Sequence, residues 1–159
     1  YPVFGPEYVE AMRTLVKEAT LITPNFTEAC FLLNEACDMT VPSEEKLRAM
    51  TGKLAALGAK QVVITSVPAG DDEIKVVSFD SATGEYAERT TPRIPFTTCG
   101  TGDVFTSVVT GALLRGETLS DAAELAMRFV SRVMEYTKDA GTDPREGVIV
   151  EPCLKELLR

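Results

Sequence analysis

The chain has 159 residues, the size of one ordinary domain, of which 45% are hydrophobic and 25% are charged. This balance excludes long disorder, collagen-like repeats and a coiled-coil rod, and no stretch approaches the length of apolar sequence that a membrane span needs. With 16 basic and 24 acidic residues, the formal net charge is −8. An acidic chain repels phosphate backbones at long range, so we expect neither a nucleic acid nor a membrane as partner.

The sequence contains no histidine. This excludes Ser-His-Asp and Cys-His nucleophilic machinery, and any proton transfer must use a carboxylate, Lys, Tyr or Cys. The four cysteines, Cys30, Cys37, Cys99 and Cys153, form no CxxC pair. We find no signal peptide and expect reduced thiols in a cytoplasmic protein. Cys30 and Cys37 would share one face of a helix, where we expect them to pack in the core.

Hydrophobic spacing and turn residues predict alternating helices and strands. In chain order we expect a helix over residues 7–19, a buried strand over 20–23, a short helix over 27–34, an amphipathic helix over 43–58, a strand over 60–66, two antiparallel edge strands with turns at 68–71 and 82–84, an apolar helix ending at Gly116, a helix over 119–137, a loop with a short strand over 141–150 and a last short helix over 151–158. Ser43 and Ser120 are the expected N-caps of the amphipathic helices, and Gly58 is the expected end of the first. This alternation predicts an α/β layered sheet.

Gly100, Thr101, Gly102 and Asp103 stand directly before the apolar helical segment. Glycines let the backbone turn sharply and approach a ligand closely. The first N–H groups of a helix point outward at the positive end of its dipole, an arrangement that binds phosphate. Asp103 would lie in the first turn, where a carboxylate stays ionised and can accept a proton from a hydroxyl. The alternative is an ordinary helix start, because Asp is favoured there and Gly is common in turns.

The segment from Thr23 to Glu28 follows the first predicted strand, at the sheet edge where open parallel sheets bind ligands. Asn25 and Glu28 could hold a hydrated Mg²⁺ ion, which favours oxygen ligands. Alternatively, Asn25 caps the next helix and Glu28 complements its dipole. The residues alone leave both interpretations open.

Thr65 and Ser66 end the next predicted strand, again at the ligand-binding edge. Their hydroxyls could contact phosphate, although turn formation before Pro68 explains Ser66 equally well. The sequence has neither a GxxxxGK[ST] motif nor a Rossmann fingerprint. A nucleotide would therefore have to be held in another way.

The order of these segments is more specific than any one of them. ITPNFTEACFLL, VVITS, a predicted hairpin and CGTGDVFTSVVTGALLRG follow one another along the chain. Together they resemble the ribokinase superfamily, and most closely its vitamin B6 branch, the pyridoxal/pyridoxine/pyridoxamine kinases. The resemblance covers most of the chain and implies a three-layer α/β/α fold with a mostly parallel central sheet and an antiparallel edge hairpin.

Two departures bear on this resemblance. Hydroxymethylpyrimidine kinases resemble the family but commonly carry Cys where this chain has Asp103, which favours the B6 branch. Family members also extend about a hundred residues further at the N-terminus, so the first parallel strands and most vitamin-binding residues are expected to be missing. Residues 1–159 are accordingly expected to be a single domain like the C-terminal ATP-binding part of such a kinase.

The resemblance implies in-line phosphoryl transfer from ATP to the 5-hydroxymethyl group of a B6 vitamer. Asp103 would take the hydroxyl proton, and the amides of Gly100, Thr101 and Gly102 would stabilise the transferring phosphoryl group. The resemblance implies that the nucleotide is contacted by Thr23, Asn25, Glu28, Thr65, Ser66, Arg93 and Phe96. Of these residues, Asn25 and Glu28 would hold Mg²⁺. The helix from Ser120 would flank the adenine together with the segment from Arg93 to Thr98.

Two alternatives stay open on the sequence. One is a hydroxymethylpyrimidine kinase of the thiamine pathway. The other is a non-catalytic, truncated nucleotide-binding or interaction domain. For the complete protein the resemblance implies a homodimer whose partners are ATP and a small-molecule substrate.

Overall fold

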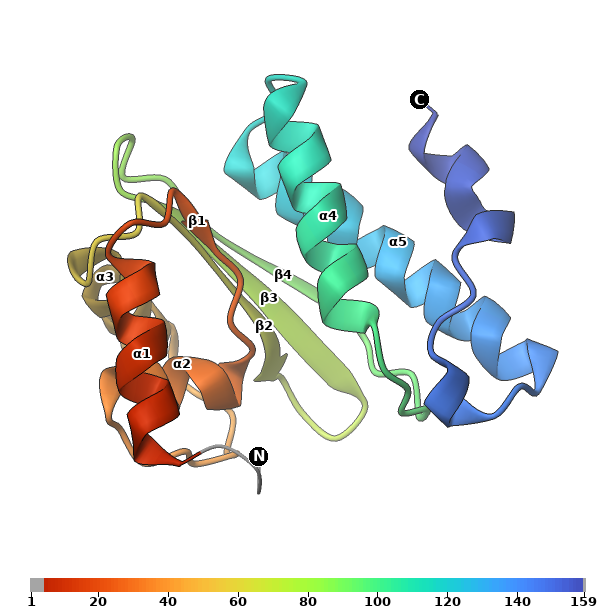
Figure 1. The fold of residues 1–159 in the computed structure, drawn as a ribbon, viewed down its shortest axis with the longest axis horizontal. Helices are drawn as coiled ribbons and strands as arrows, with labels where there is room; N and C mark the ends of the chain where they lie inside the picture. Colours follow the sequence, from red (N-terminus) through yellow and green to blue (C-terminus); the bar gives the residue numbers. More distant parts are fainter. Residues whose placement is uncertain (1–4, 159) are drawn as a thin grey trace. The chain divides into compact units, whose positions relative to one another are not determined.

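The structure, a computed structural model, describes residues 5–158, which form two compact units that meet in the chain between Thr90 and Thr91 (Figure 1). The first unit contains α1 (Pro6–Val16), β1 (Leu21–Ile22), α2 (Phe26–Leu33), α3 (Glu44–Ala56), β2 (Gln61–Pro68), β3 (Glu73–Asp80) and most of β4 (Tyr86–Pro92). The second contains α4 (Thr101–Leu114), α5 (Leu119–Ala140) and two 3₁₀ helices, η1 (Pro144–Glu146) and η2 (Glu151–Leu157). None of the described helices is long and apolar enough to cross a membrane.

The sheet has the order β1-β2-β3-β4 and is mixed, which confirms the α/β prediction. β1 runs parallel to β2, with Leu21 opposite Gln61, whereas β2 and β3 pair antiparallel. The three central residues of β2 (Val62, Val63 and Ile64) are completely buried. A continuous apolar run of this kind is typical of a strand that is covered on both faces.

β2 is longer than the sequence predicts. The prediction ended the strand at Ser66, but pairing with β3 resumes at Val67 after a shift in register at Thr65 and Ser66. These two residues oppose one residue of β3, which is a β-bulge. Ser66 has a φ of +55°, in the left-handed region that non-glycine residues rarely adopt. The strand therefore bends at Ser66 and continues to Pro68.

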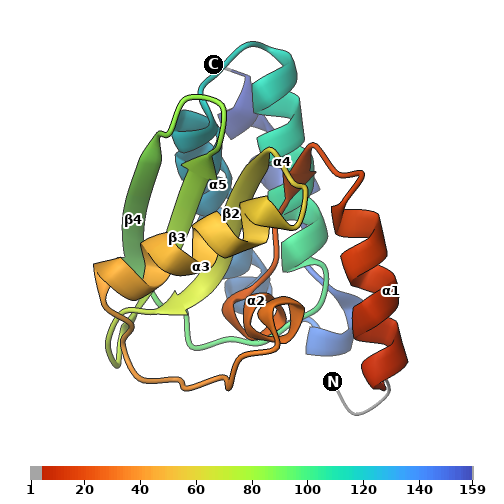
Figure 2. The same cartoon turned by 90° about the vertical axis from the view of Figure 1, so that its left-hand side faces the viewer.

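The core of the first unit lies where α2 and α3 pack against the sheet. Figure 2 shows α3 lying across β2 and β3. The buried core residues are Val16, Phe26, Ala29, Cys30, Leu32, Leu47, Met50, Leu54, Ala59, Val62, Ile64, Val67 and Val77. Ser43 caps α3 as predicted, its side chain accepting a hydrogen bond from Lys46 N. Gly58 follows the helix with a φ of +135°, and a Cβ there would lie 2.6 Å from the backbone of Lys17, so only glycine fits.

The second unit is an antiparallel pair of helices, α4 and α5, with η2 packed on α5. Its buried centre (Phe129, Val133 and Cys153) contacts apolar side chains of α4 and of the segment after η1. The predicted N-cap of α5 is wrong, because Thr118 accepts the hydrogen bond from Asp121 N whereas Ser120 is buried in the first turn. Residues 141–150 contain η1 and no strand within the described part of the chain, and the last helix is a 3₁₀ helix.

All four cysteines are free thiols. Burial raises the pKa of Cys30 to about 11, and a hydrogen bond with Cys37 adds to this effect. Cys30 is therefore neutral near pH 7 and packs as a small apolar group, as predicted. The prediction that Cys30 and Cys37 share one face of a helix is wrong, because α2 ends at Leu33 and Cys37 lies beyond the helix.

The buried face of α3 yields a stability prediction. Leu54 is completely buried in the core of the first unit, so Leu54→Ala should lower the free energy of unfolding by about 2–5 kcal/mol through lost burial and the cavity left behind. The matched control is Leu15→Ala on α1, where the side chain is 65% exposed and the change should stay within about 0.5 kcal/mol. Urea denaturation measures both. Equal effects would contradict the core assigned here.

Candidate functional site

The first group of candidate residues lies where β1 passes into α2. Asn25 Oδ1 accepts a hydrogen bond from Glu28 N at 2.9 Å, and Glu28 Oε2 accepts one from Asn25 N at 2.9 Å. This reciprocal arrangement is a capping box, which satisfies two backbone donors at the start of α2. Of the two interpretations that the sequence left open, the structure contains the capping one. A metal role for the same oxygens stays a prediction.

The end of β1 is tied to β2. Thr65 N donates to Pro24 O at 2.9 Å, and Asn25 and Thr65 form a parallel bridge. The structure thus brings Asn25, Glu28 and Thr65 to the carboxyl end of the parallel pair, as predicted from the strand order. Ser66 is the next residue and is exposed. The bulge turns its backbone into the left-handed region, an arrangement that costs about 1–2 kcal/mol and recurs at functional sites.

An open cavity of about 970 Å³ lies between α1 and the β1–α2 segment. Thr23, Pro24 and Glu28 line it on one side, and Arg13 of α1 lines it on the other. The Arg13 guanidinium donates to the carbonyls of Leu32 (2.8 Å) and Phe31 (3.2 Å) at the end of α2. Sequence reasoning did not single out Arg13, because only the tertiary structure brings α1 against the end of α2.

The second group lies at the start of α4, in the other unit. Gly100 is the N-cap with a φ of +90°, and no side chain caps this helix. The first bond of the helix is donated by Val104 N to Gly100 O at 3.1 Å, so the N–H groups of Thr101, Gly102 and Asp103 precede the intrahelical ladder. Gly102 and Asp103 are both exposed. The predicted glycine turn is therefore formed, with the Asp103 carboxylate in the first turn of α4, and anion binding there stays a prediction.

The turn before α4 is braced by the segment around η1. Thr98 Oγ1 donates to Pro144 O at 2.8 Å, and Cys99 Sγ lies 3.6 Å from Arg145 O. Gly147, with a φ of +86°, passes close enough to Cys99 that a Cβ there would lie 3.4 Å from the Cys99 carbonyl oxygen. Sequence reasoning missed this brace. Its only local signal is the Asp-Pro turn and the glycine that follow α5.

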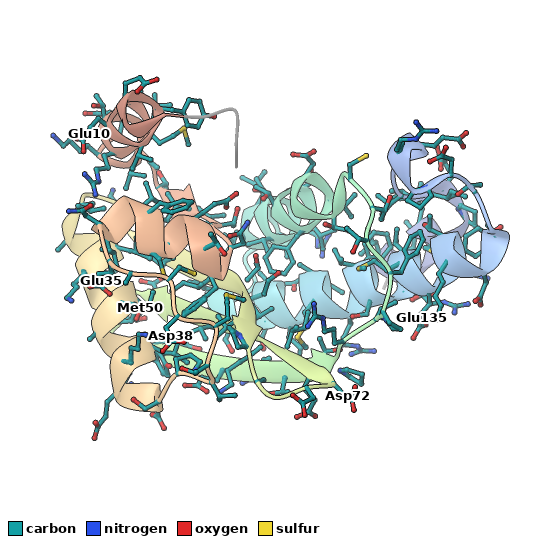
Figure 3. The ribbon with its side chains drawn as sticks, turned by 90° about the horizontal axis from the view of Figure 1, so that it is seen from below. Glu10, Glu35, Asp38, Met50, Asp72 and Glu135 are labelled. Atoms are coloured by element: carbon teal, nitrogen blue, oxygen red, sulfur yellow. The ribbon has the colours of Figure 1, made fainter. Side chains whose placement is uncertain are left out.

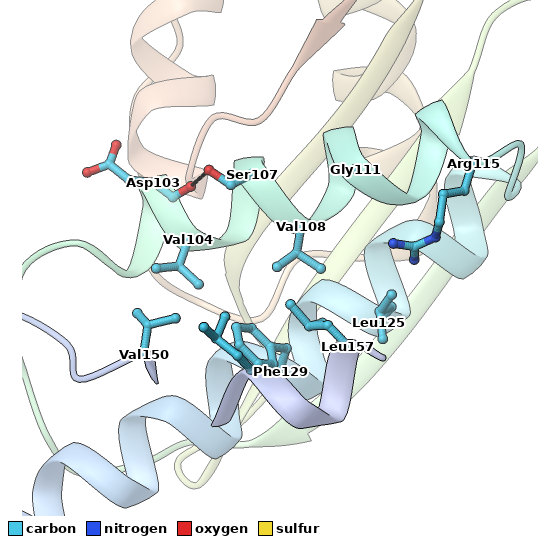
Figure 4. A pocket seen from close by; sticks show the side chains of 11 residues that line it. Asp103, Val104, Ser107, Val108, Gly111, Arg115, Leu125, Phe129, Val150 and Leu157 are labelled. Carbon is cyan, nitrogen blue, oxygen red and sulfur yellow. Dashed lines mark hydrogen bonds between the residues drawn. The ribbon is translucent and has the colours of Figure 1, made fainter. Parts of the chain in front are cut away.

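Asp103 also borders an apolar groove of about 390 Å³ between α4, α5 and η2 (Figure 4). Figure 4 shows Asp103 at one end of the groove and Arg115 at the other. The walls between them are largely apolar, formed by Val104, Val108, Gly111, Leu125, Phe129, Val150, Leu154 and Leu157, with Ser107 as the polar exception. Asp103 is thus an exposed residue at the end of an apolar groove.

Arg93 and Phe96 lie in the segment that joins β4 to α4. Arg93 is exposed and Phe96 is half-buried, with Phe96 N donating to Ile94 O at 2.8 Å. Their assignment to the nucleotide stays a prediction.

Among residues 5–158, no group of three or more Cys, Asp or Glu side chains could hold a metal ion. Side chains of these three types therefore form no complete metal site in that part of the chain.

The fold and the two groups of residues define an α/β chain with an uncapped, glycine-rich start of α4 and side-chain oxygens at the end of a parallel strand. The sequence model of the phosphomethylpyrimidine kinase family matches residues 2–147. The chain therefore belongs to this family.

Individual relatives include phosphomethylpyrimidine kinases and a pyridoxal kinase. A hydroxymethylpyrimidine/phosphomethylpyrimidine kinase of Staphylococcus aureus is 31% identical over 131 residues, which cover 80% of this chain and 45% of the relative. A Bacteroides thetaiotaomicron protein assigned as a phosphomethylpyrimidine kinase, in a crystal form with pyridoxal, is 35% identical with a TM-score of 0.93 over 100% of this chain and 56% of that one. Pyridoxal kinase from Lactobacillus plantarum is 32% identical with a TM-score of 0.81 over 98% of this chain and 55% of that one. The chain thus spans about half the length of its relatives.

The start of α4 gives a prediction that separates its two glycines. Gly100→Ala places a Cβ on a backbone with a φ of +90° and should destabilise the chain by about 1–2 kcal/mol. In Gly102→Ala the new Cβ has no atom within 4 Å, and the helix should gain up to about 1 kcal/mol. Thermal unfolding of both variants is the measurement. Destabilisation by Gly102→Ala would contradict the open turn described here.

Proposed function

We propose that this chain supplies the ATP-binding and catalytic part of a kinase that phosphorylates the hydroxymethyl group of a small heteroaromatic compound, foremost the 5-hydroxymethyl group of a B6 vitamer. The observation that carries the proposal is the start of α4. There the backbone N–H groups of a helix, without a side-chain cap, lie next to the exposed carboxylate of Asp103. Phosphoryl transfer needs this pair of features, a set of fixed donors for phosphoryl oxygens and a base for the attacking hydroxyl.

In the proposed reaction the substrate hydroxyl oxygen attacks the γ-phosphorus of ATP while the bond to the β-phosphate oxygen of ADP breaks. Asp103 accepts the hydroxyl proton. The N–H groups of Thr101 and Gly102 donate to the oxygens of the transferring phosphoryl group, whose charge the positive end of α4 also stabilises. Gly102 suits this role because, apart from its chain neighbours and the backbone of its own helix, no atom lies within 4 Å of the position of a Cβ, which leaves the backbone open to a ligand.

Mg²⁺ would be held by Asn25 and Glu28 in this proposal. The atoms that would bind the ion are oxygens, from the amide of Asn25 and the carboxylate of Glu28. The capping box uses one hydrogen-bonding position on each side chain. A carboxylate has about four acceptor positions, so the donor set fits an ion that keeps several waters and takes further oxygens from a nucleotide. Such an ion neutralises charge on the β- and γ-phosphates when it is bound.

The remaining predicted residues take nucleotide-contacting roles in the proposal. Thr23 lines the cavity beside Glu28, and Thr65 and Ser66 offer hydroxyls at the end of the parallel strands. Arg93 would contact the nucleotide as the exposed cation of its segment, and Phe96 would contact the adenine.

The proposed base is tested by Asp103→Asn. In the complete kinase that contains this chain, loss of a positioned general base should lower the rate of ATP-dependent phosphorylation of pyridoxal by about 10²- to 10⁴-fold while Mg·ATP affinity stays within about twofold. The matched control is Asp121→Asn, since Asp121 is likewise an exposed carboxylate in the first turn of a helix. Release of ADP measures the rate. A rate for Asp103→Asn within tenfold of the unaltered chain would contradict the role of Asp103.

The hydroxymethylpyrimidine alternative is favoured by the family match itself and by the Staphylococcus aureus relative. The B6 assignment is supported by the Lactobacillus plantarum pyridoxal kinase at 32% identity and by the crystal form of the Bacteroides protein that contains pyridoxal. Asp103 stands where the pyrimidine branch commonly carries Cys, which also supports the B6 assignment.

Parallel assays of the complete kinase that contains this chain, with pyridoxal and with hydroxymethylpyrimidine, distinguish the two substrates. We expect kcat/KM for pyridoxal to exceed that for hydroxymethylpyrimidine by about tenfold or more, the discrimination that about 1.4 kcal/mol of differential binding produces. The reverse order would assign the chain to the pyrimidine reaction and keep the catalytic roles unchanged.

A further inference from the structure

Three sulfur atoms meet in the first unit, at the end of α2. α2 ends at Asn34, whose φ of +56° turns the backbone into the left-handed region. The chain then passes back beside the helix, so that Cys37 Sγ lies 3.7 Å from Thr27 Oγ1 and 3.7 Å from Met39 Sδ. Cys37 also packs against the core cluster that contains Cys30, and its proximity contributes to the raised pKa of Cys30. Cys37 therefore lies between the exposed Met39 and the buried Cys30.

The spacing of Cys37 Sγ and Met39 Sδ suits two ligands of one metal ion. Two sulfur ligands that each lie about 2.3 Å from one metal are about 3.8–4.0 Å apart at tetrahedral or trigonal angles. The distance from Cys37 Sγ to Met39 Sδ, 3.7 Å, agrees with this to about 0.3 Å. Little movement of either side chain would be needed to bring both sulfurs onto one ion.

We propose that Cys30, Cys37 and Met39 form a binding site for a soft monovalent cation, Cu⁺. Thiolate and thioether sulfur select Cu⁺ over hard cations such as Mg²⁺, and Cu⁺ displaces to solvent the proton of each thiol that it binds. Zn²⁺ is a poorer match, because structural zinc sites take four nitrogen or thiolate ligands, whereas this site offers two thiols and one thioether. The site shares no residue with the proposed kinase site, and its existence does not depend on that function.

The solvent exposure of the three sulfur-bearing side chains decreases from Met39 through Cys37 to Cys30. Met39 is 61% exposed, Cys37 is half-buried and Cys30 is 1% exposed. An ion would thus meet Met39 and Cys37 first and reach Cys30 last. Figure 3 shows the surrounding region, with Glu35 and Asp38 labelled in the segment after α2 and Met50 on α3. Met50 is buried in the same core as Cys30, so solvent does not reach the inner ligand from that side.

Anaerobic titration with Cu⁺ against a chromophoric Cu⁺ chelator tests the proposal. We expect one Cu⁺ per chain in competition with the chelator, and an X-ray absorption spectrum of the bound copper with only sulfur neighbours at about 2.3 Å. Cys37→Ser should abolish this competition. Met39→Leu, which removes only the outer ligand, should weaken binding about tenfold.

The controls are chosen outside the cluster. Cys99→Ser removes an exposed thiol, and Met12→Leu removes a partly exposed thioether on α1, so both should bind Cu⁺ like the unaltered chain. Cys37 is preferred to the buried Cys30 for substitution, because its loss leaves the core intact. Competition that survives Cys37→Ser, or a Met39→Leu variant with unchanged affinity, would overturn the proposal. Formation of a Cys30–Cys37 disulfide by mild peroxide without any Cu⁺ binding would overturn it as well.

Discussion

The proposed phosphoryl-transfer chemistry depends on the left-handed turn at Gly100, the residue before α4. The starts of α2, α3 and α5 are each closed by a side chain that accepts a hydrogen bond from the first turn, namely Asn25, Ser43 and Thr118. α4 begins instead at a glycine with a φ of +90° and has no side-chain cap. Its first donors are consequently left for solvent or for a ligand. The segment around η1 holds this turn through Thr98 and Cys99, so the donors are positioned before any ligand arrives.

The first unit shows how one pair of side chains can serve structure and chemistry together. The capping box between Asn25 and Glu28 fixes both side chains at the end of β1. A residue that is already held in place by a helix cap loses little further freedom when it binds an ion. The bulge at Thr65 and Ser66 lies beside it through the bridge between Asn25 and Thr65. Local hydrogen bonding therefore gathers polar groups at this edge of the sheet.

Much of this arrangement follows from local sequence. The Ser43 cap, the apolar run of β2 and the Gly-Thr-Gly-Asp turn are set by neighbouring residues, and each forms as predicted. The sequence predicts Ser120, followed by Asp121, as the cap of α5, and only the geometry of the first turn selects Thr118. A helix-capping role and a metal role use the same residue types, so the sequence could not choose between them for Asn25 and Glu28.

Other features depend on contacts between distant residues and have no local pattern. The bulge in β2 exists only relative to its pairing with β3, which is why the strand was ended too early at Ser66. The brace on the α4 turn joins residues 46 positions apart. Cys37 reaches Cys30 because the chain reverses at Asn34, and not because the two share a helical face.

The most direct test of the proposed nucleotide site is calorimetric titration of this chain with Mg·ATP, comparing the unaltered chain with Glu28→Gln. Gln keeps the capping box, since its side-chain oxygen can accept the same hydrogen bond from Asn25 N, but it removes the negative charge that would hold Mg²⁺. We predict unchanged stability, Mg·ATP affinity weakened about tenfold, and no difference between the two chains for ATP in the presence of a Mg²⁺ chelator. Equal Mg·ATP affinity for both chains, or no binding by the folded chain, would contradict the account.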